Sequence, residues 1–399
     1  MFQLSMGEAR VRDLLAALSE QIDRELPGAI ELRHELHRLP ELSGAEARTR
    51  DRVLDALPAE LARTSVADTG AVLRIGGPGR SVAVRAELDG LAVTERTELP
   101  WASTRPGVMH ACGHDVHLAA LVALCRAAHA VDVPVPLVGI LQPREETYPS
   151  GARDIAESGV LTEHQVRATI GAHVQPLLPD GTVACVPGAV NASCDEFTIT
   201  VRGSGGHAAY PQLTRDPVLG LTQVVVAAQS LVSRRMDPMA TAVLSVTTLD
   251  AGAAPNVTPD IATARGTIRA MNETARQQLH AELAELVERV AEAHGCAGEL
   301  AVHGGEPVLH NDPRITEGTA RYLRAQDITV DEVLRSAGSD DFAYFSACYP
   351  SLMMFVGTHG GSERLHSATF APDDEHIRQV ARAMLAGYLG AASTLGMDG

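Results

Sequence analysis

The sequence predicts an α/β protein that carries a ferredoxin-like α+β unit as an insertion, and two patterns support this prediction. Short runs rich in β-branched residues at 71–75, 81–86 and 137–141 alternate with helix-like segments, as in sheets covered by helices. Between residues 190 and 303 the expected order changes to strand, helix, two strands, helix, strand, which is that of a ferredoxin-like unit. We therefore expect one sheet that is interrupted by a separate domain.

The domain boundaries follow from where this change begins and ends. The character of the sequence shifts near Gly188, and the α/β pattern resumes after the last strand of the insertion. The expected division is a main domain over 1–188 and 305–399, and an inserted domain over 189–304.

The individual elements follow from hydrophobic periodicity and from breakers. Two N-terminal helices are expected, over 6–25 and 27–39, because Pro27 is favoured in the first turn of a helix and Pro40 ends the second. The other elements outside the insertion are expected as helices at 44–57, 117–131, 150–160, 313–326, 340–348 and 375–395, and a strand at 352–356. The elements of the insertion are expected as strands at 194–202, 241–249, 261–270 and 299–303, and helices at 215–235 and 273–294.

The composition excludes several kinds of partner. The chain has 399 residues and a net charge of −17, whereas nucleic acids and anionic membranes are bound through basic patches. The longest apolar runs, such as 118–125, are too short to span a bilayer, and the N-terminus lacks the pattern of a secretory signal. Six cysteines without a Cys-x-x-Cys pair fit a reducing compartment, so we expect a cytoplasmic protein.

The stretch 109–117 is unusually rich in metal-ligand types, with three histidines, one cysteine and one aspartate. Cys112 and His114 flank Gly113, which lets the backbone bend so that a thiolate and an imidazole can reach one ion. Asp115 follows directly, and a carboxylate beside a ligand imidazole fixes its tautomer. Any one of these residues alone is more often a structural residue, but the cluster as a whole favours a metal site.

Two adjacent glutamates, Glu145 and Glu146, follow the strand expected at 137–141. Adjacent side chains at the end of a strand point to opposite sides, so one carboxylate can bind a metal while the other faces a water molecule. A carboxylate in that position is the usual general base of metal-assisted hydrolysis. A solvated pair in a loop is the alternative interpretation, because adjacent glutamates are common.

Single histidines elsewhere add to this set. His173 ends the run 168–173, and His366 lies in a polar turn before the last helix. Each of them alone is a weak candidate. Sulfur, nitrogen and oxygen donors together suit Zn, Mn, Co or Ni better than Mg or Ca, and their number would allow two ions. By contrast, His34 and His37 lie among charged residues on a helix, and we expect both on the surface.

The chain resembles a known family of metal-dependent amidohydrolases, which includes aminoacylases, hippurate hydrolase, the auxin–amino acid conjugate hydrolases and, more distantly, carboxypeptidase G2. The resemblance covers nearly the whole chain. The motifs that carry it are, in order, Arg33-His-Glu-Leu-His-Arg-Leu-Pro-Glu-Leu, Arg85-Ala-Glu-Leu-Asp-Gly-Leu, the stretch 109–117, Gln142-Pro-Arg-Glu-Glu, Gly203-Ser-Gly-Gly-His-Ala-Ala-Tyr-Pro, Pro255-Asn-Val-Thr-Pro-Asp, Gly266-Thr-Ile-Arg, Gly338-Ser-Asp-Asp-Phe and Leu365-His.

The resemblance implies a zinc-peptidase-like domain with a central mixed sheet, and an inserted domain that serves as lid and dimerisation surface. It implies a homodimer that hydrolyses the amide bond of N-acyl amino acids with two divalent metal ions. The implied metal ligands are Cys112, His114, Glu146, His173 and His366.

The resemblance also implies roles for residues around the metals. Glu145 would act as the general base and then as the acid that protonates the leaving amine. His207 and Asn256 would steady the carbonyl oxygen, and Arg269 would meet a substrate carboxylate. Two further carboxylates are implied as outer partners that orient the ligands, Asp89 and Asp115.

Three positions depart from the family pattern. Glu87 stands where an aspartate is usual, and Asp340 stands where a glutamate is usual. The run 147–150, Thr-Tyr-Pro-Ser, replaces a glycine-rich run after the glutamate pair. We expect Tyr148 to reshape the pocket and to contact the substrate, so the substrate cannot be copied from a relative.

Other functions are compatible with parts of this pattern. A dipeptidase or carboxypeptidase would use the same dinuclear site on a different acyl half. A metal-binding protein without catalysis would be expected to have lost one of the site residues. A thiol redox protein centred on Cys112 is disfavoured by the absence of a Cys-x-x-Cys pair.

Overall fold

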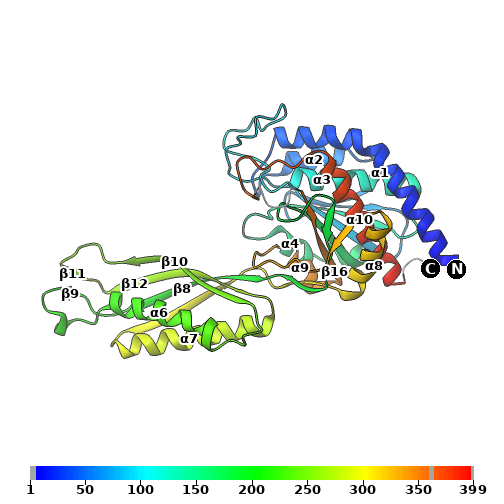
Figure 1. Cartoon of the computed structure of the whole chain (residues 1–399). Helices are drawn as coiled ribbons and strands as arrows, with labels where there is room; N and C mark the ends of the chain where they lie inside the picture. Colours follow the sequence, from blue (N-terminus) through cyan, green and yellow to red (C-terminus); the bar gives the residue numbers. More distant parts are fainter. Residues whose placement is uncertain (1–5, 359–363, 397–399) are drawn as a thin grey trace. The chain divides into compact units, whose positions relative to one another are not determined.

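The computed structural model describes residues 6–358 and 364–396, which form two compact units (Figure 1). The first unit holds the described residues of Met1–Gly188, His310–Leu334 and Tyr344–Gly399, and the second holds Ala189–Leu309 and Arg335–Ala343. The second unit therefore includes a short segment that lies beyond the expected end of the inserted domain at 304. The domain boundaries themselves stay a prediction.

A mixed eight-stranded sheet forms the centre of the first unit, which confirms the predicted α/β fold. Its strands are, in spatial order, β1 (Ala62–Val66), β2 (Gly70–Ile75), β4 (Leu137–Gln142), β3 (Ser81–Glu87), β5 (Val166–Gln175), β16 (Ser351–Gly357), β6 (Thr182–Ala184) and β15 (Thr329–Asp331). Neighbours are parallel from β4 through β3 and β5 to β16, and antiparallel at β1–β2, β2–β4 and β16–β6. Because parallel strands end at one edge, the residues that follow β3 and β4 come together there.

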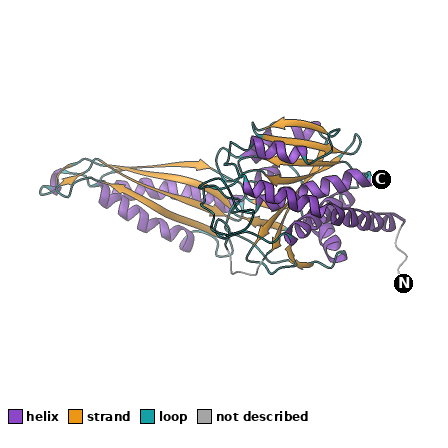
Figure 2. Cartoon of the chain, turned by 90° about the horizontal axis from the view of Figure 1, so that it is seen from above, coloured by secondary structure: helices purple, strands orange, loops and turns teal. Residues whose placement is uncertain are grey.

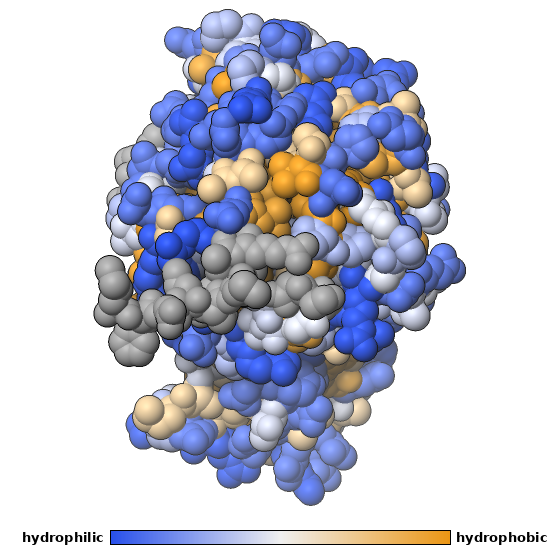
Figure 3. Space-filling view, turned by 90° about the vertical axis from the view of Figure 1, so that its right-hand side faces the viewer, coloured by the Kyte–Doolittle hydropathy of each residue, from blue (hydrophilic) through white to orange (hydrophobic). Residues whose placement is uncertain are grey.

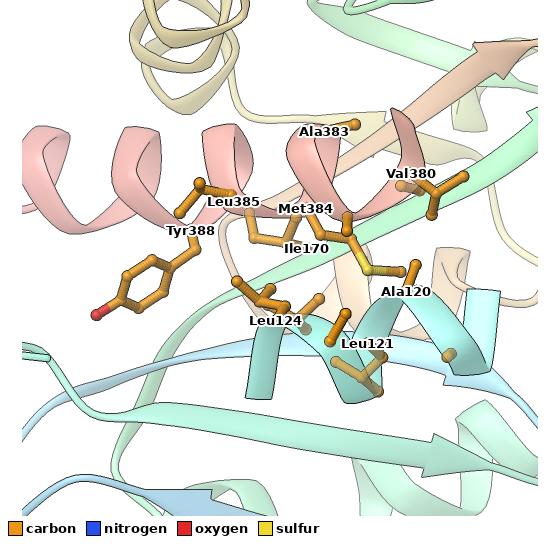
Figure 4. Close-up of a cluster of buried hydrophobic side chains, with 14 of the residues drawn as sticks. Ala120, Leu121, Leu124, Ile170, Val380, Ala383, Met384, Leu385 and Tyr388 are labelled. Atoms are coloured by element: carbon orange, nitrogen blue, oxygen red, sulfur yellow. The ribbon is translucent and has the colours of Figure 1, made fainter. Parts of the chain in front are cut away.

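Helices of the first unit pack on one another and on the central strands. They are α1 (Met6–Arg38), α2 (Ala47–Asp55), α3 (His114–Val131), α4 (Gly151–Glu157), α5 (Val160–Glu163), α8 (Pro313–Ala325), α9 (Ala343–Cys348) and α10 (Glu375–Thr394). Figure 4 shows Leu121 and Leu124 of α3 facing Met384 and Tyr388 of α10, with Ile170 of β5 between the two helices. Each large apolar side chain buried here stabilises the fold by about 1.5–3 kcal/mol.

The N-terminal helix α1 is continuous, so the prediction of two helices that meet at Pro27 is wrong. Leu18, Ile22, Leu26 and Ala29 are all buried and follow one another at helical spacing across the proline. Burial of this stripe against α3 and α10 keeps the segment helical, although Pro27 removes one backbone hydrogen bond.

The second unit has the predicted ferredoxin-like order. Its antiparallel sheet runs β10 (Ala242–Ala251), β12 (Ile261–Ala270), β8 (Ser193–Arg202), β13 (Ala297–Gly304), and Figure 2 shows two helices alongside these strands, α6 (Pro217–Arg234) and α7 (Glu273–Ala293). A two-stranded ribbon of β9 (Gly206–His207) and β11 (Val257–Thr258) extends from it. The remaining short elements are β7 (Gly188–Asn191), η1 (Pro211–Leu213) and β14 (Leu309–Asn311).

Among the residues that the structure describes, no helix has both the length and the apolar character that crossing a bilayer requires. Figure 3 shows hydrophilic side chains over most of the face that it draws.

Candidate metal centre

Within the stretch 109–117, a glycine in the left-handed conformation lets the thiol of Cys112 and the imidazole of His114 converge. Gly113 has a φ of +85° and directly precedes α3, whose first residue is His114. A Cβ on Gly113 would lie 2.6 Å from Cγ2 of Val174, so the position excludes a side chain. Cys112 is buried on the other side of the glycine, and its Sγ lies 3.4 Å from Nε2 of His173.

Two buried imidazoles are oriented by backbone carbonyls. His114 donates from Nδ1 to the carbonyl oxygen of Asp89 at 2.8 Å, and His173 donates from Nδ1 to the carbonyl oxygen of Val174 at 2.7 Å. In the neutral form of each ring the lone pair is therefore on Nε2, where a metal would bind. Burial, together with the neighbouring His117, lowers the pKa of His173 well below its usual value and keeps this ring neutral.

Glu146 completes a set of three donors. The ligand atoms of Cys112, His114 and Glu146 all lie within 4.8 Å of one another. The backbone N–H of Glu146 donates to Oδ2 of Asp89 at 3.0 Å, so one residue orients two members of the set. His366 approaches from the loop before α10, with its Nε2 3.4 Å from Oε1 of Glu146 and half of its side chain exposed.

Glu145 stands beside this set. Its Oε2 lies 3.8 Å from Nε2 of His114, and its side chain is only 12% exposed. The structure thus brings the six residues that the sequence singled out for metal binding and base catalysis to one edge of the sheet.

The donors fit a divalent transition metal or zinc. Sulfur, imidazole nitrogen and carboxylate oxygen are combined, as in sites for borderline or soft ions. Within this donor set and its support, three buried polar atoms have no hydrogen-bond partner among the described residues: Asp89 Oδ1, His114 Nε2 and Glu146 Oε1. A bound ion is one of the ways in which such atoms are satisfied. Burial raises the pKa of the Cys112 thiol well above its usual value, and a cation beside it would reverse this by stabilising the thiolate.

A second group of potential donors lies next to the first, Glu87, His114, His117 and His173. His117 donates from Nδ1 to Oε2 of Glu87 at 2.9 Å and accepts the N–H of Val174 on Nε2 at 3.0 Å, while Arg85 pairs with Glu87. Both nitrogens of His117 are therefore engaged, and this group supports the ligands instead of holding a further ion. Sequence reasoning missed the roles of Glu87 and His117, although both lie inside motifs that it quoted.

Asp115 binds the N-terminal helix. Its Oδ2 accepts hydrogen bonds from Arg33 Nε and His37 Nδ1, both at 3.0 Å. The ring of His114 is instead hydrogen-bonded to Asp89. The expectation that His37 lies on the surface is wrong, because its side chain is fully buried and is stabilised there by hydrogen bonds to carboxylates.

His37 also contacts a second carboxylate, since its Nε2 lies 3.2 Å from Glu95. Burial alone would lower its pKa, but Asp115 and Glu95 together raise the pKa of His37 to about 9. Its neighbour His34 is only partly exposed and lies 3.0 Å from Asp374, so the surface prediction is also wrong in part for that residue.

Two implied oxygen-binding residues lie together in the second unit. His207 of β9 pairs with Val257 of β11, and Ala208 donates its N–H to the carbonyl oxygen of Asn256 at 3.1 Å. Nδ1 of His207 accepts the N–H of Ala209 at 3.1 Å, so the proton of the neutral ring is on Nε2. His207 and Asn256 are both exposed.

Arg269 lies at the opposite end of the second unit's sheet. It pairs with Cys194 near the end of β12, and it donates from Nη1 to the carbonyl oxygen of Ala337 at 3.1 Å. The first residue of that strand, Ile261, borders the β9–β11 ribbon, which Figure 1 shows at the far end of the sheet. Because a strand rises by about 3.3 Å per residue, the length of β12 between Ile261 and Arg269 places Arg269 about 25 Å from the ribbon.

Comparison with known proteins agrees with this geometry. Residues 83–388 match the model of peptidase family M20/M25/M40. An N-acetyldiaminopimelate deacetylase of Bacillus subtilis (strain 168) is 34% identical over 89% of this chain and 96% of its own length. An N-acetylcysteine deacetylase of the same strain is 33% identical over 87% of this chain and 92% of its own length.

A solved structure supports the same assignment. A Bacillus subtilis dinuclear metal-binding peptidase of the M20 family superposes with a TM-score of 0.82 at 29% identity, over 94% of this chain and 99% of its own. The fold, the convergent donors and the length of these matches lead to one conclusion: the chain is a hydrolase that belongs to peptidase family M20/M25/M40.

Proposed function

We propose that the protein hydrolyses the amide bond of N-acyl amino acids and releases a carboxylic acid and an amino acid. The observation that carries this proposal is the Glu145 carboxylate, which lies 3.8 Å from His114 Nε2 at the edge of a mixed donor set. The two Bacillus subtilis deacetylases act on N-acetylated amino acids, which supports the same substrate class here. The six free cysteines support a cytoplasmic location.

Two divalent ions are the proposed cofactors, with Zn, Mn, Co and Ni as the candidates. Their proposed ligands are Cys112, His114, Glu146, His173 and His366. When bound, such ions would polarise a carbonyl oxygen and lower the pKa of a water molecule. The dinuclear character of the solved relative supports the number of ions.

Glu145 is proposed to move the proton of the reaction. Its carboxylate takes a proton from the attacking water molecule while the water oxygen bonds to the amide carbon. It then gives this proton to the amide nitrogen as the carbon–nitrogen bond breaks, so that the amine leaves as a neutral group. Glu145 is unchanged at the end, and positioned acid–base groups of this kind typically contribute about 10²–10⁴-fold to the rate.

His207 and Asn256 are proposed to bind the carbonyl oxygen, and Arg269 is proposed to bind the carboxylate of the amino acid. The proton on Nε2 of His207 supports its role, because this N–H can donate to the oxygen as negative charge develops. A guanidinium fork matches a carboxylate with two parallel hydrogen bonds.

A homodimer is the proposed assembly, and the geometry of the second unit supports it. His207 and Arg269 of one chain are about 25 Å apart, too far for both to contact one small substrate. We therefore propose that His207 and Asn256 act on the substrate bound by a second copy.

A substrate panel tests the proposed reaction. Metal-stripped protein would be given Zn, Mn or Co one at a time, and then N-acetyl, N-benzoyl and long-chain-acyl amino acids or unblocked dipeptides. We expect metal-dependent release of the amino acid from the acylated compounds. Activity on dipeptides alone would identify a peptidase and contradict the proposal.

A single substitution tests the role of Glu145. Glu145→Gln removes the base but keeps the size of the side chain, so we expect unchanged metal content and a loss of kcat of at least about 10²-fold. Glu163→Gln, at the exposed C-terminal end of α5, serves as the matched control. A Glu145→Gln protein with the kcat of the wild type would show that another group moves the proton.

Complementation tests the dimer. Glu145→Gln and His207→Ala proteins would be inactive alone. If His207 acts across the dimer, mixed dimers recover one intact site, and a statistical mixture reaches about a quarter of wild-type activity. No recovery after verified subunit exchange would mean that His207 does not act on the partner.

A further inference from the structure

The loop that carries Glu145, Glu146 and Tyr148 runs from Arg144, after β4, to Gly151 at the start of α4. We propose that Arg144 holds this loop in shape and thereby determines which acyl groups the site accepts. The claim about acyl groups rests on the function proposed above. The claim about the shape of the loop rests on the contacts of Arg144. Arg144 is a positioning residue, since it acts through Tyr148 and not on the substrate.

The backbone of Arg144 turns the chain. Its φ is +50°, a left-handed conformation that residues with a side chain rarely adopt. Its N–H donates to Oε1 of Glu46 at 2.9 Å. Glu46 is fully buried, and its carboxylate also accepts the N–H of Gly44 at 2.7 Å and the hydroxyl of Thr69 at 2.6 Å. The turn before Glu145 and Glu146 is thus held by a carboxylate from outside the loop.

Arg144 also closes the loop. Its carbonyl oxygen accepts the N–H of Gly151 at 3.2 Å, and its Nε donates to the carbonyl oxygen of Pro149 at 3.1 Å. A Cβ on Gly151 would lie 1.8 Å from the carbonyl oxygen of Pro143, so the two ends of the loop approach as closely as a glycine permits. Residues 145–150 therefore form a loop that is closed by the backbone hydrogen bond from Gly151 to Arg144 and by the side chain of Arg144.

The guanidinium of Arg144 is tied to two segments outside the loop. Its Nη1 donates to the carbonyl oxygen of Ala67 at 3.1 Å and lies 3.2 Å from the carboxylate of Asp68, between β1 and β2. Its Nη2 pairs with Asp154 in α4, and the side chain is only 9% exposed. An arginine can make these contacts because its nitrogens point in different directions, whereas a lysine has a single nitrogen.

These contacts fix the segment next to the exposed aromatic ring. The Tyr148 side chain is 55% exposed, and it is adjacent to Pro149, whose carbonyl oxygen Arg144 holds. Without the guanidinium, this segment loses its link to the β1–β2 turn and to α4. Glu146 keeps its own anchor, because its N–H donates to Asp89 at 3.0 Å. Loss of the Arg144 side chain should therefore change acyl selectivity and leave metal binding intact.

The first test is Arg144→Asn, because asparagine tolerates the left-handed backbone but is too short to reach the anchors. We expect the ratio of kcat/KM for N-acetyl over N-benzoyl substrates of one amino acid to change at least tenfold. The Tyr148→Ala substitution should change the same ratio, and the double variant should behave like Tyr148→Ala alone. Arg153→Asn is the matched control, since Arg153 is exposed and pairs only one helical turn away with Glu157.

Hydrogen exchange tests the same inference without a substrate. Amides of residues 145–150 should exchange at least tenfold faster in Arg144→Asn and at the wild-type rate in Arg153→Asn, with equal metal content in both. If Arg144→Asn does not fold, the paired substitution Asp68→Ala and Asp154→Ala removes two anchors and should give the faster exchange.

The outcomes separate this inference from the proposed function. A wild-type protein that hydrolyses no acylated amino acid defeats the proposed function, and the exchange rates then decide on Arg144. In an active Arg144→Asn protein, an acyl ratio within twofold of the wild type overturns the inference. Additive effects of Arg144→Asn and Tyr148→Ala on this ratio, or unchanged exchange of 145–150, overturn it as well.

Discussion

The Nδ1 atom of His117 lies 2.9 Å from Oε2 of Glu87, and Nε2 of the same ring accepts the N–H of Val174 at 3.0 Å. Arg85 pairs with the other side of the Glu87 carboxylate, and both side chains are buried. The contact therefore joins β3, α3 and β5 next to the metal donors. It requires a charged Glu87, because removal of one partner leaves a buried charge without compensation.

Glu87→Gln should strongly destabilise the protein. We expect the free energy of unfolding to fall by roughly 3–5 kcal/mol, because Arg85 loses the charge that compensates it. Urea unfolding of the metal-free protein measures this loss. Glu60→Gln is the control, since Glu60 pairs with His129 on the surface and should change stability by less than about 1 kcal/mol. Equal stability of the two variants would show that the buried charge is compensated elsewhere.

His37 should make stability depend on pH. Asp115 and Glu95 outweigh burial and raise its pKa from 6.5 to about 9. A raised pKa in the folded state stabilises the protein fully below pH 6.5, and this contribution is lost as the pH rises through 9. The loss amounts to about 3 kcal/mol, measured as the difference in unfolding free energy between wild type and His37→Gln across this range.

A surface histidine provides the control for that measurement. His129→Gln removes a histidine whose partner, Glu60, is exposed, so the pH dependence of this variant should follow the wild type. If His37→Gln retains the decline of stability between pH 6.5 and 9, the decline belongs to another group.

Two glycines that both have a positive φ allow the cost of backbone strain to be measured separately from the cost of a steric clash. Gly107 has a φ of +75° and open space around its Cβ position, so Gly107→Ala should cost only about 1 kcal/mol. Gly113→Ala adds a clash with Val174 and should cost about 2–4 kcal/mol in total. It should also weaken metal binding roughly tenfold or more, because it moves Cys112 against His114. Thermal unfolding and metal titration check both effects, and equal costs for the two variants would exclude the clash.

Cys112→Ser tests the role of the thiolate. Exchange of sulfur for a hydroxyl removes the soft donor, so Zn affinity should fall by about 10²-fold and Mn affinity by less. Cys348→Ser is the control, because Cys348 is exposed and should not affect metal binding. In the wild type, bound metal should also slow the reaction of Cys112 with a thiol reagent. Unchanged Zn affinity in Cys112→Ser would remove Cys112 from the ligand set.

The sequence allowed prediction of those features that depend on local pattern. The strand at 261–270 and the ferredoxin-like order of the second unit were predictable from alternating residues and turns, and the structure agrees. The donors Cys112, His114 and Glu146 were predictable because unusual residue types stand close together or directly after a strand. Strand β1 was not, because its residues are largely exposed and carry little apolar pattern.

Features that depend on partners distant in the sequence could not be predicted in the same way. His37 looked like a surface residue because its neighbours in the helix are charged, while its partner Asp115 is 78 residues away. The contact of Glu87 with His117 and the anchoring of Arg144 by Glu46 likewise join separate elements. Only the folded arrangement shows which polar residues have a buried counterpart.

The length of β12 has a consequence for assays of this protein. If one chain cannot supply both Arg269 and His207 to the same substrate, an isolated chain is inactive, and specific activity depends on total protein concentration. Dilution below the dissociation constant of the dimer should then lower turnover per chain, with a lag on re-concentration that reflects association. The strand would in this way make catalysis proportional to the fraction of assembled protein.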